Sequence, residues 1–515
     1  MSALRLARLG QVAAALAVLG GAPVGCSLTL DFEDECKVEA DCAVVGRGMR
    51  CDRGFCTKKD LLQVDGPCDR VFGEDPRTAA EGSVIVIGTL LPKSGALGSY
   101  GQPMENGVEL AVSEINQSGG VLGRKIGVVA CDSGTDAAQG VLGARHLVDV
   151  AEVDAIVGAG ASGVTIEAFT KVAKPGGVLM VTPSATSPAI TNLPDDGLLW
   201  RTAPSDAIQG RAIAGHLLES GARRVAVVNR DDAYGNGLAL VVQQELCAAT
   251  TCTSDNFINR VYAQDFADPV REGQQVAIVA DLEAFAPDTV VLVAFVEDGV
   301  RLLNLAEGKG FRWVLTDGMK DAGLLGPRVS GAAPGTGVAS DATLCAIVGT
   351  NPGAPDPTFF QPFEVKYSGR YGTPPKNFEA RSYDALYAIG LAYAAAHGAG
   401  VADADVDGRA LALGLTRLAS GLPIAFGIEE WNSGVAALSA DATTSIDISG
   451  ASGRLDFNPV VGEAPGAIDL WRFDLDAASD DAKIEELGVV LDDTGRYIQG
   501  VVTARPTGDP CRSGR

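Results

Sequence analysis

From Ser83 onward, short apolar runs alternate with longer amphipathic stretches that have the length of helices. The short runs are rich in Val, Ile and Leu, which is typical of strands buried on both faces of a parallel sheet. A helix between two parallel strands carries the chain back across the sheet. The sequence therefore predicts an α/β fold whose sheets are covered by helices on both faces.

The expected elements follow each other as strand and then helix at least six times. The expected strands are residues 83–90, 125–130, 154–157, 178–181, 224–229, 289–295 and 312–315. The expected helices include residues 102–116, 137–151, 164–173, 207–220, 234–249 and 299–308. A single doubly wound sheet of this length is uncommon, and residues 199–205, which contain Pro204, read as a crossover. We therefore expect two lobes.

The character of the chain changes towards its C-terminus. Residues 439–457 are rich in Ser, Thr, Asp and Gly, whereas residues 467–475 and 497–503 read as strands. We expect these two strands to be antiparallel edge strands.

Residues 1–25 have the composition of an export signal. Arg5 and Arg8 provide a positive start, residues 9–22 are apolar but too few to span a bilayer, and small residues follow. Residues 23–26 read Pro-Val-Gly-Cys and resemble a bacterial lipobox, although Pro23 stands where that pattern usually has Leu. We expect residues 1–25 to be removed and Cys26 to be lipidated. The alternative is ordinary cleavage nearby, with Cys26 left for a disulfide.

The cysteine content favours an oxidising compartment. Eleven cysteines are present, so an even number remains once Cys26 is set aside. Residues 26–82 combine cysteines with charged and turn-forming residues, which predicts a disulfide-stapled stalk. The disulfide candidates are Cys36, Cys42, Cys51 and Cys56 in the stalk, and Cys247 with Cys252 further on. The stalk cysteines could instead hold zinc, but no His is near and paired CxxC spacings are missing, so we expect no metal.

Charge and hydropathy exclude two classes of function. The formal net charge of −24 repels phosphate backbones, which argues against nucleic-acid binding. After residue 25 no stretch reaches ~18 uninterrupted apolar residues, which argues against a transmembrane receptor or channel.

Residues 158–163, Gly-Ala-Gly-Ala-Ser-Gly, follow an expected strand and match the dinucleotide pattern G-x-G-x-x-G. That pattern requires an acidic residue after the next strand, but this strand ends in Val-Thr-Pro-Ser at 181–184. The loop instead brings free N–H groups to a helix start, which suits an anion. The histidines, His146, His216 and His397, fall in separate helices without a catalytic motif. We therefore expect neither an enzyme nor a cofactor.

Several segments resemble, in the same order, the branched-chain amino-acid and amide-binding proteins of the periplasm. They are residues 87–101, 106–116, 119–123, 156–162, 182–187, 200–202, 232–237 and 380–385. The resemblance covers about residues 83–475. It implies the type 1 periplasmic binding protein fold, with two Rossmann-like lobes, a three-strand hinge and a ligand in the cleft. We expect residues 83–203 plus about 337–440 in lobe 1, and residues 204–336 plus about 441–515 in lobe 2.

The resemblance also implies binding residues for the charged groups of an amino acid. Ser162 would bind the α-carboxylate, and the loop carrying Ser184, Ala185 and Thr186 would provide carboxylate donors and an ammonium acceptor. Asp317 would pair with the ammonium group. The alternatives are a helix cap at Ser162, a plain turn at residues 182–186 and a solvated turn at Asp317.

Three aromatic residues occupy positions that the resemblance assigns to ligand packing. Tyr234 would contact the ligand from the second lobe, and Tyr100 and Phe295 hold comparable places on other loops. Aromatic residues belong more often to a core than to a ligand site, which is the alternative for all three.

These observations together predict a solute-binding lipoprotein. We expect it to be exported, anchored by lipid on the periplasmic side of a bacterial membrane, and to deliver a small amino-acid-like or amide ligand to an ABC-type permease. One alternative is a ligand sensor of the same fold that signals to a membrane partner. Another is a structural surface lipoprotein that binds no ligand.

Overall fold

The computed structural model describes residues 35–38, 41–42, 49–58, 60–62, 66–80, 82–264, 269–329, 336–353, 356–376, 378–475, 483–492, 495–502 and 511. The expected signal peptide and Cys26 lie outside the described residues. The chain divides into two compact units, Met1–Lys58 and Lys59–Arg515.

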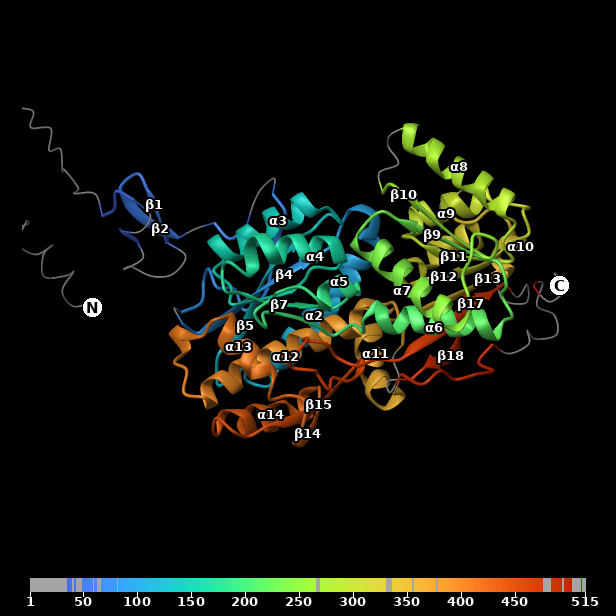
Figure 1. The fold of residues 1–515 in the computed structure, drawn as a ribbon. Helices are drawn as coiled ribbons and strands as arrows, with labels where there is room; N and C mark the ends of the chain where they lie inside the picture. Colours follow the sequence, from blue (N-terminus) through green and yellow to red (C-terminus); the bar gives the residue numbers. More distant parts are fainter. Residues whose placement is uncertain are drawn as a thin grey trace, which may run out of the picture. The chain divides into compact units, whose positions relative to one another are not determined.

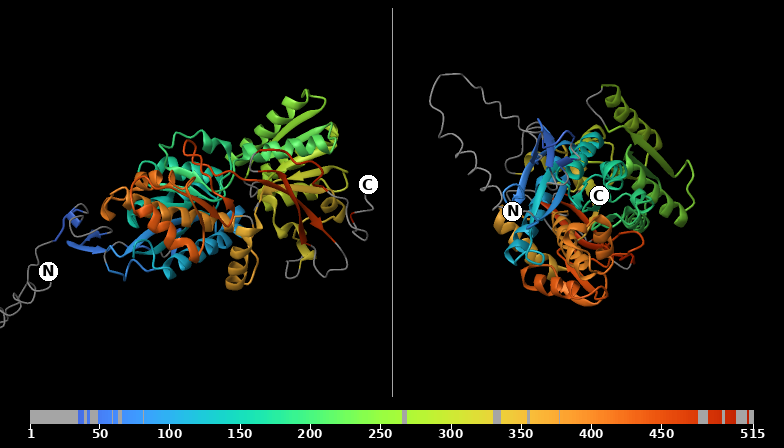
Figure 2. Two further views of the ribbon diagram at one scale, coloured as in Figure 1. Left: turned by 90° about the horizontal axis from the view of Figure 1, so that it is seen from below. Right: turned by 90° about the vertical axis from the view of Figure 1, so that its left-hand side faces the viewer.

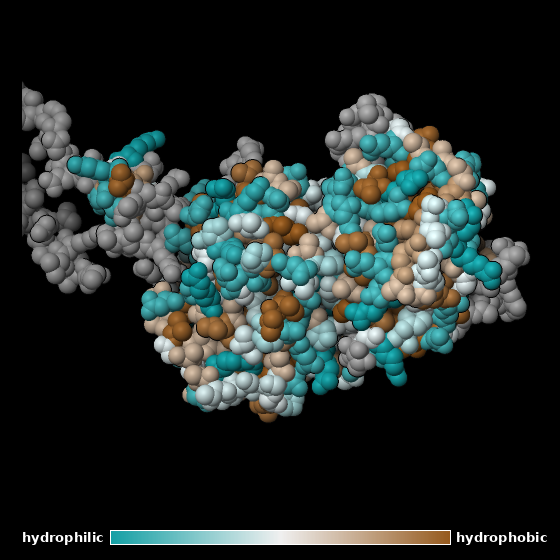
Figure 3. Space-filling view, in the orientation of Figure 1, coloured by the Kyte–Doolittle hydropathy of each residue, from teal (hydrophilic) through white to brown (hydrophobic). Residues whose placement is uncertain are grey.

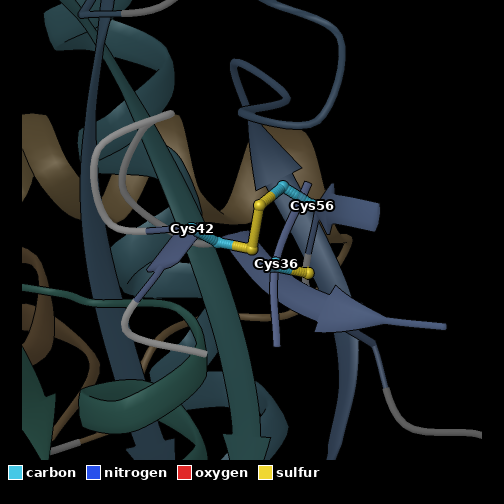
Figure 4. Close-up of side chains that lie close together, drawn as sticks. All are labelled: Cys36, Cys42 and Cys56. Carbon is cyan, nitrogen blue, oxygen red and sulfur yellow. A yellow bond between two sulfur atoms is a disulfide. The ribbon is translucent and has the colours of Figure 1, made fainter. Parts of the chain in front are cut away.

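The smaller unit contains a hairpin of β1 (Met49–Asp52) and antiparallel β2 (Phe55–Lys58). Two disulfides, Cys36–Cys51 and Cys42–Cys56, tie the preceding chain to this hairpin. Figure 4 shows the sulfur atoms of Cys36, Cys42 and Cys56 close together, with Cys42 bonded to Cys56. A cysteine binds zinc only as a thiolate, so this pairing favours a disulfide staple over a metal site.

The sheet of the first lobe has six strands in the order β3-β5-β4-β6-β7-β8. Its strands are β3 (Cys68–Gly73), β4 (Val84–Leu91), β5 (Lys125–Asp132), β6 (Ala155–Gly158), β7 (Leu179–Thr182) and β8 (Leu199–Arg201). Neighbouring strands are parallel except for β3, which is antiparallel to β5. Its N-terminal helices are α2 (Gly98–Gln117), α3 (Ala137–Arg145), α4 (Ser162–Ala168) and α5 (Pro188–Thr191), and π-helical turns extend α3 and α4.

Later segments of the chain complete the first lobe (Figure 1). They comprise α11 (Pro357–Tyr371), α12 (Glu379–Gly398), α13 (Gly408–Leu415) and α14 (Ile428–Ser439), with a small sheet of β14 (Leu422–Ala425), β15 (Ile446–Gly450) and β16 (Gly453–Arg454). Helix α12 is buried over nearly its whole length. Its Asp384 accepts hydrogen bonds from Ala451 N (2.7 Å) and Ser452 N (2.8 Å), which fixes the small sheet to the helix.

The sheet of the second lobe has seven strands in the order β10-β9-β11-β12-β13-β17-β18. They are β9 (Val225–Arg230), β10 (Phe257–Tyr262), β11 (Thr289–Val293), β12 (Arg312–Leu315), β13 (Ile347–Pro352), β17 (Ile468–Asp474) and β18 (Lys483–Leu491). The helices around this sheet are α6 (Asp206–Glu219), α7 (Ala233–Ala249), α8 (Pro269–Phe285), α9 (Val296–Leu305) and α10 (Asp341–Cys345). The first five strands in chain order run parallel, whereas β17 and β18 are antiparallel.

Alternate residues of β9 pack against different helices. Val227 belongs to one apolar cluster with Leu238 of α7, and Val228 belongs to another with Leu302 of α9. Because successive side chains of a strand point to opposite faces, α7 and α9 cover the two faces of this sheet. The expected α/β class is confirmed in both lobes (Figures 1 and 2).

The structure corrects four expectations about boundaries and strands. Residues from about 441 onward were expected in lobe 2, but β15 and β16 pair with β14 in the small sheet of the first lobe. Strand β3 lies inside the segment expected to be stalk, but it pairs with β5 and is joined to it by the disulfide Cys68–Cys131. Strand β13 lies in the segment expected in lobe 1, yet it pairs with β12 in the second lobe. Among the described residues of 497–503, only Tyr497 pairs, in one isolated bridge, and Gly500 turns the chain with φ 75°. The outer antiparallel strand is β18 instead.

Three connections cross between the lobes, and one buried arginine bonds two of them directly. They lead from β8 to α6, from β13 to α11 and from β16 to β17. Arg381 of α12 donates to the carbonyl oxygens of Thr202 (3.3 Å) and Gly353 (2.7 Å), which lie in the first two connections. The N–H of Gly353 donates to Ala467 O (3.0 Å) in the third connection. Arg381 therefore ties the hinge together.

The described surface is mixed in polarity. On the face seen in Figure 3, apolar residues form small separate groups among polar ones. None of the helices in the described part of the chain has both the length and the apolar character needed to cross a membrane.

Candidate ligand-binding site

A pocket between the two lobes encloses about 400 Å³ of unfilled space, part of which is open to solvent. The space that the centre of a water molecule can occupy inside it is much smaller, about 30 Å³. From the first lobe it is lined by Pro92, Leu97, Tyr100, Met104, Gly160, Ala161, Ser162, Ser184, Thr186 and Phe378. From the second lobe it is lined by Tyr234, Phe295, Asp317 and Gly318. Seven of the eight expected binding residues therefore line one pocket, and Ala185 does not.

Ser162 lies where the loop after β6 enters α4. It is the first residue of the helix rather than its N-cap, and its Oγ accepts a hydrogen bond from Ser187 N (3.2 Å). The hydroxyl proton is therefore left to donate. At Gly160 a Cβ atom would lie 2.7 Å from Cδ of Pro92, so the glycine allows the loop to approach the end of β4 closely. The Gly-rich pattern thus serves close packing around the pocket.

The loop after β7 presents two hydroxyl groups to the pocket. Ser184 Oγ donates to Gly160 O (2.9 Å), and Thr186 Oγ1 donates to Oδ2 of Asp206 (2.9 Å). Since the Thr186 proton is committed to Asp206, its oxygen remains an acceptor towards the pocket. Ala185 is fully buried, and its carbonyl oxygen accepts from Nη1 of Arg201 (3.3 Å). Ala185 does not line the pocket, but a carbonyl oxygen has a second lone pair, so its expected contact with the ligand stays a prediction.

Arg201 at the end of β8 holds this loop in place. Its Nη1 also donates to Ser187 O (3.0 Å), and its Nη2 donates to Thr191 Oγ1 (2.7 Å). Glu463, from the third connection, pairs with the same guanidinium at 2.5 Å. Sequence reasoning identified Arg201 only as part of a family motif. The signal for its role is a charged residue at the end of an apolar strand.

Asp317 is buried and begins the 3-10 turn Asp317–Met319, two residues after the end of β12. Its Oδ1 accepts a hydrogen bond from the Tyr234 hydroxyl (2.7 Å), which also lies 2.8 Å from Thr316 Oγ1. Burial raises the pKa of Asp317 above its ordinary value of 3.8. The Tyr234 ring stacks on Phe295 with centroids 5.7 Å apart. An acceptor and an aromatic pair thus reach the pocket from the second lobe.

A second buried carboxylate, Asp206, lies behind Thr186. Oδ2 of Asp206 accepts from that threonine, while Oδ1 has no hydrogen-bond partner within the described structure. Burial raises the pKa of Asp206 well above 3.8, and the negative charge of Asp317 raises it further. Sequence reasoning missed this residue because Asp206 follows Ser205 at a helix start, where an acidic residue is ordinary.

The rest of the pocket wall is apolar. Tyr100 and Phe378 pack with ring centroids 6.2 Å apart, and Leu97 and Met104 add aliphatic surface. Sequence reasoning found Tyr100 but not Phe378, Leu97 or Met104, because apolar residues in helices resemble core positions. The site thus combines a polar end with an apolar wall, which suits a small molecule that has charged groups and an apolar part.

The expected small-loop disulfide Cys247–Cys252 is present at the end of α7. Two further disulfides, Cys68–Cys131 and Cys345–Cys511, were not assigned from the sequence. Their partners are 63 and 166 residues apart, so no local spacing could pair them.

Comparison with known proteins yields consistent matches. A Leu/Ile/Val-binding protein of Rhizobium johnstonii is 39% identical over 156 residues, which cover 30% of this chain and 42% of that protein. An isoleucine complex of a branched-chain amino acid transporter substrate binding protein from Streptococcus pneumoniae has 20% identity and a TM-score of 0.57, covering 78% of this chain and 99% of that one. A type 1 periplasmic binding protein from Bordetella pertussis has 18% identity and a TM-score of 0.61, covering 78% and 100%.

The two solved structures share the fold described above. The curated relative is matched over less than half of its length. The sequence pattern of the family described as "Periplasmic binding protein" matches residues 84–438, which is more than half of the chain and includes strands of both lobes together with the pocket. The chain belongs to the periplasmic binding protein family.

Proposed function

We propose that this protein captures a small zwitterionic amino acid, or a related amide, in the interlobe pocket and delivers it to an ABC-type permease. One observation carries the proposal. A hydroxyl donor, Ser162, and a buried carboxylate, Asp317, come from opposite lobes and line the same pocket. A ligand that contacts both groups stabilises the closed arrangement of the lobes.

Each end of the ligand has its own partners in this proposal. The Ser162 hydroxyl and the N–H groups at the start of α4 bind the carboxylate. Asp317 and the Thr186 oxygen accept from the ammonium group in charge-assisted hydrogen bonds. Tyr100, Phe295 and the remaining apolar residues pack on the side chain. The names of the relatives, which bind Leu, Ile and Val, support an aliphatic ligand.

Export and lipid anchoring at Cys26 are part of the proposal. Five disulfides, including those of the small N-terminal unit, support an oxidising compartment. Family membership supports the periplasmic side of a membrane. Mass spectrometry of the protein from its native membrane tests the anchor, since a diacylated Cys26 at the N-terminus is the expected product.

Calorimetric titration against amino acids, their amides and amine-free carboxylic acids tests the binding proposal. Asp317→Asn removes the charge with little change in shape, so we expect at least ~100-fold weaker binding of zwitterions. Ser162→Ala should weaken binding less, because the backbone N–H donors of α4 remain. The control is Asp281→Asn, an exposed carboxylate on α8 that pairs with Arg260. Undiminished affinity in Asp317→Asn would refute the ammonium assignment.

The same panel separates the other functions considered for this fold. A structural lipoprotein would bind none of the compounds. A sensor would bind a ligand, but deleting the protein would leave cellular uptake of that ligand unchanged. A transport protein would lose uptake along with binding.

A further inference from the structure

Asp321 is a preorganised anion on the second lobe. It follows β12 by a short 3-10 turn and caps the next one, because its Oδ1 accepts from Gly323 N (2.7 Å). Its side chain is only 10% exposed. The capping bond fixes the side-chain rotamer of Asp321, so contacts within the second lobe alone set the direction of Oδ2.

The partners of Oδ2 all come from the first lobe. Lys376 Nζ lies 2.8 Å away and Ser99 Oγ donates from 3.2 Å. Lys376 follows Pro374 and Pro375 just before α12, and prolines limit the freedom of the chain that presents it. Two lobes that are linked by a hinge therefore meet in one charge-assisted contact.

This contact lies beside the ligand pocket but outside it. None of Ser99, Asp321 and Lys376 lines the pocket. The Lys376 ammonium does lie 5.4 Å from the ring centroid of Tyr100, which is part of the pocket wall. The Tyr100 hydroxyl donates to Lys320 O (3.2 Å), the neighbour of Asp321. The ion pair and the Tyr100 hydrogen bond are thus neighbouring contacts between the lobes at the edge of the pocket.

We propose that Asp321, Lys376 and Ser99 form an electrostatic latch that holds the lobes closed and sets ligand affinity without touching the ligand. The inference rests on the proposed binding function. When the lobes separate, Oδ2 of Asp321 and the ammonium group of Lys376 return to water, so the pair stabilises only the closed state. Apparent affinity follows the fraction of molecules in the binding-competent state.

The latch has two signatures that a ligand contact would not have. Because it acts on closure alone, breaking it weakens the binding of every ligand by the same factor and leaves selectivity unchanged. Because Lys376 is 39% exposed, the latch also weakens as salt screens the pair. The change should appear mainly as faster dissociation, since the closed complex is what the latch stabilises.

The experiment is a double-mutant cycle on the full mature chain, with Kd and dissociation rate measured for at least three ligands. Lys376→Gln and Asp321→Asn should each raise Kd by about fivefold. The Kd of the double variant should be no higher than that of either single variant. Lys376→Glu, which adds repulsion, should raise Kd further. The matched control is Arg260→Gln, which breaks an ion pair of 2.6 Å with Asp281 inside the second lobe, where the arginine is 38% exposed. That variant should leave Kd unchanged.

Small-angle X-ray scattering keeps the test independent of ligand identity. Without ligand, Lys376→Glu should increase the radius of gyration relative to wild type, whereas the Arg260 control should not. If wild type binds no compound but Lys376→Glu still opens the lobes, the binding proposal fails and the latch stands. If Lys376→Gln leaves Kd unchanged, or changes it unequally for different ligands, the latch is wrong. An unchanged radius in Lys376→Glu overturns it as well.

Discussion

The Tyr234 hydroxyl lies 2.7 Å from Oδ1 of Asp317, and both residues are buried. Tyr234 comes from the first turn of α7 and Asp317 from the 3-10 turn after β12, so the bond joins two elements of the second lobe. It orients the carboxylate before any ligand arrives. A carboxylate fixed in this way loses little conformational freedom when it binds an ammonium group.

Tyr234→Phe should therefore weaken ligand binding by about tenfold, the equivalent of one hydrogen bond to a charged group. The aromatic ring and its stacking on Phe295 are retained, so stability should change little. Calorimetric titration measures the loss. Tyr497→Phe is the matched control, because its hydroxyl donates to the carboxylate of Glu219 (2.8 Å) away from the pocket. Equal effects in both variants would contradict the proposed role of Tyr234.

Ligand affinity should fall as pH is lowered towards acid. Burial raises the pKa of Asp317 and of Asp206 above 3.8, and an ammonium ligand binds the charged carboxylate. Protonation therefore competes with binding in a window above the ordinary aspartate range. Affinity measured between pH 4 and 8 would contradict this account if it stayed constant.

The stability of the unliganded protein should change with pH in the opposite direction to ligand affinity, because protonation of Asp317 and Asp206 favours the folded state. A carboxyl group with a raised pKa in the folded state contributes stability below its unfolded pKa and loses it as pH rises through the folded pKa. Asp469 of β17 behaves in the same way, because burial raises its pKa to about 6. Asp469→Asn should therefore raise the free energy of unfolding at pH 8 by up to about 3 kcal/mol, with no gain at pH 4. Urea denaturation of the variant and of the wild type at both pH values measures this gain. An equal change in unfolding free energy at pH 4 and pH 8 would contradict the raised pKa of Asp469.

Arg201→Lys should reduce affinity more than it reduces stability. Lysine keeps the charge next to Glu463 but cannot hold the carbonyl groups of Ala185 and Ser187 together, so the pocket loop loosens. We expect at least ~10-fold weaker binding and a loss of about 1 to 2 kcal/mol in unfolding free energy. Glu463→Gln, which keeps an acceptor for the arginine, should have a smaller effect on Kd. An equal increase in Kd for the two variants would show that the charge matters and the loop geometry does not.

The disulfides should differ in what they contribute. Replacing Cys68 and Cys131 by Ala opens a link across 63 residues and should cost about 4 kcal/mol of unfolding free energy. Replacing Cys247 and Cys252, which are 5 residues apart, should cost about half as much or less. Thermal unfolding of the two double variants compares them directly. A larger loss for the short loop would show that local strain outweighs chain entropy.

Repetition in the sequence was enough to predict the α/β class and two lobes. The strand expected at residues 312–315 and the helix expected at 234–249 lie within a residue or two of β12 and α7. The assignments failed where pairing is non-local. Strand β3 is defined by its antiparallel partner β5 and by the disulfide to a distant cysteine. The lobe to which β13 belongs is decided by its pairing with β12 and β17. Neither property is written in a local run of residues.

The candidate site shows the same division. Ser162, Thr186 and Asp317 follow strands in recognisable loops, so their meeting in one pocket could be anticipated. The roles of Asp206 and Arg201 could not be anticipated, because Asp206 resembles an ordinary acidic residue in the first turn of a helix and Arg201 resembles a motif residue. Their roles come from burial and from partners supplied by other segments, such as Glu463, which is far away in the chain.

The order of strands in the second sheet has a consequence for biosynthesis. Strand β13 pairs with β17, but α11 to β16 of the other lobe come between them in the chain. While a nascent chain lacks residues 468–474, one side of β13 carries unpaired backbone groups, which are a template for aggregation. Long-range pairing of this kind also forms slowly. A chaperone that shields β13 until synthesis is almost finished would therefore raise the yield of native protein more than one that acts on the first lobe.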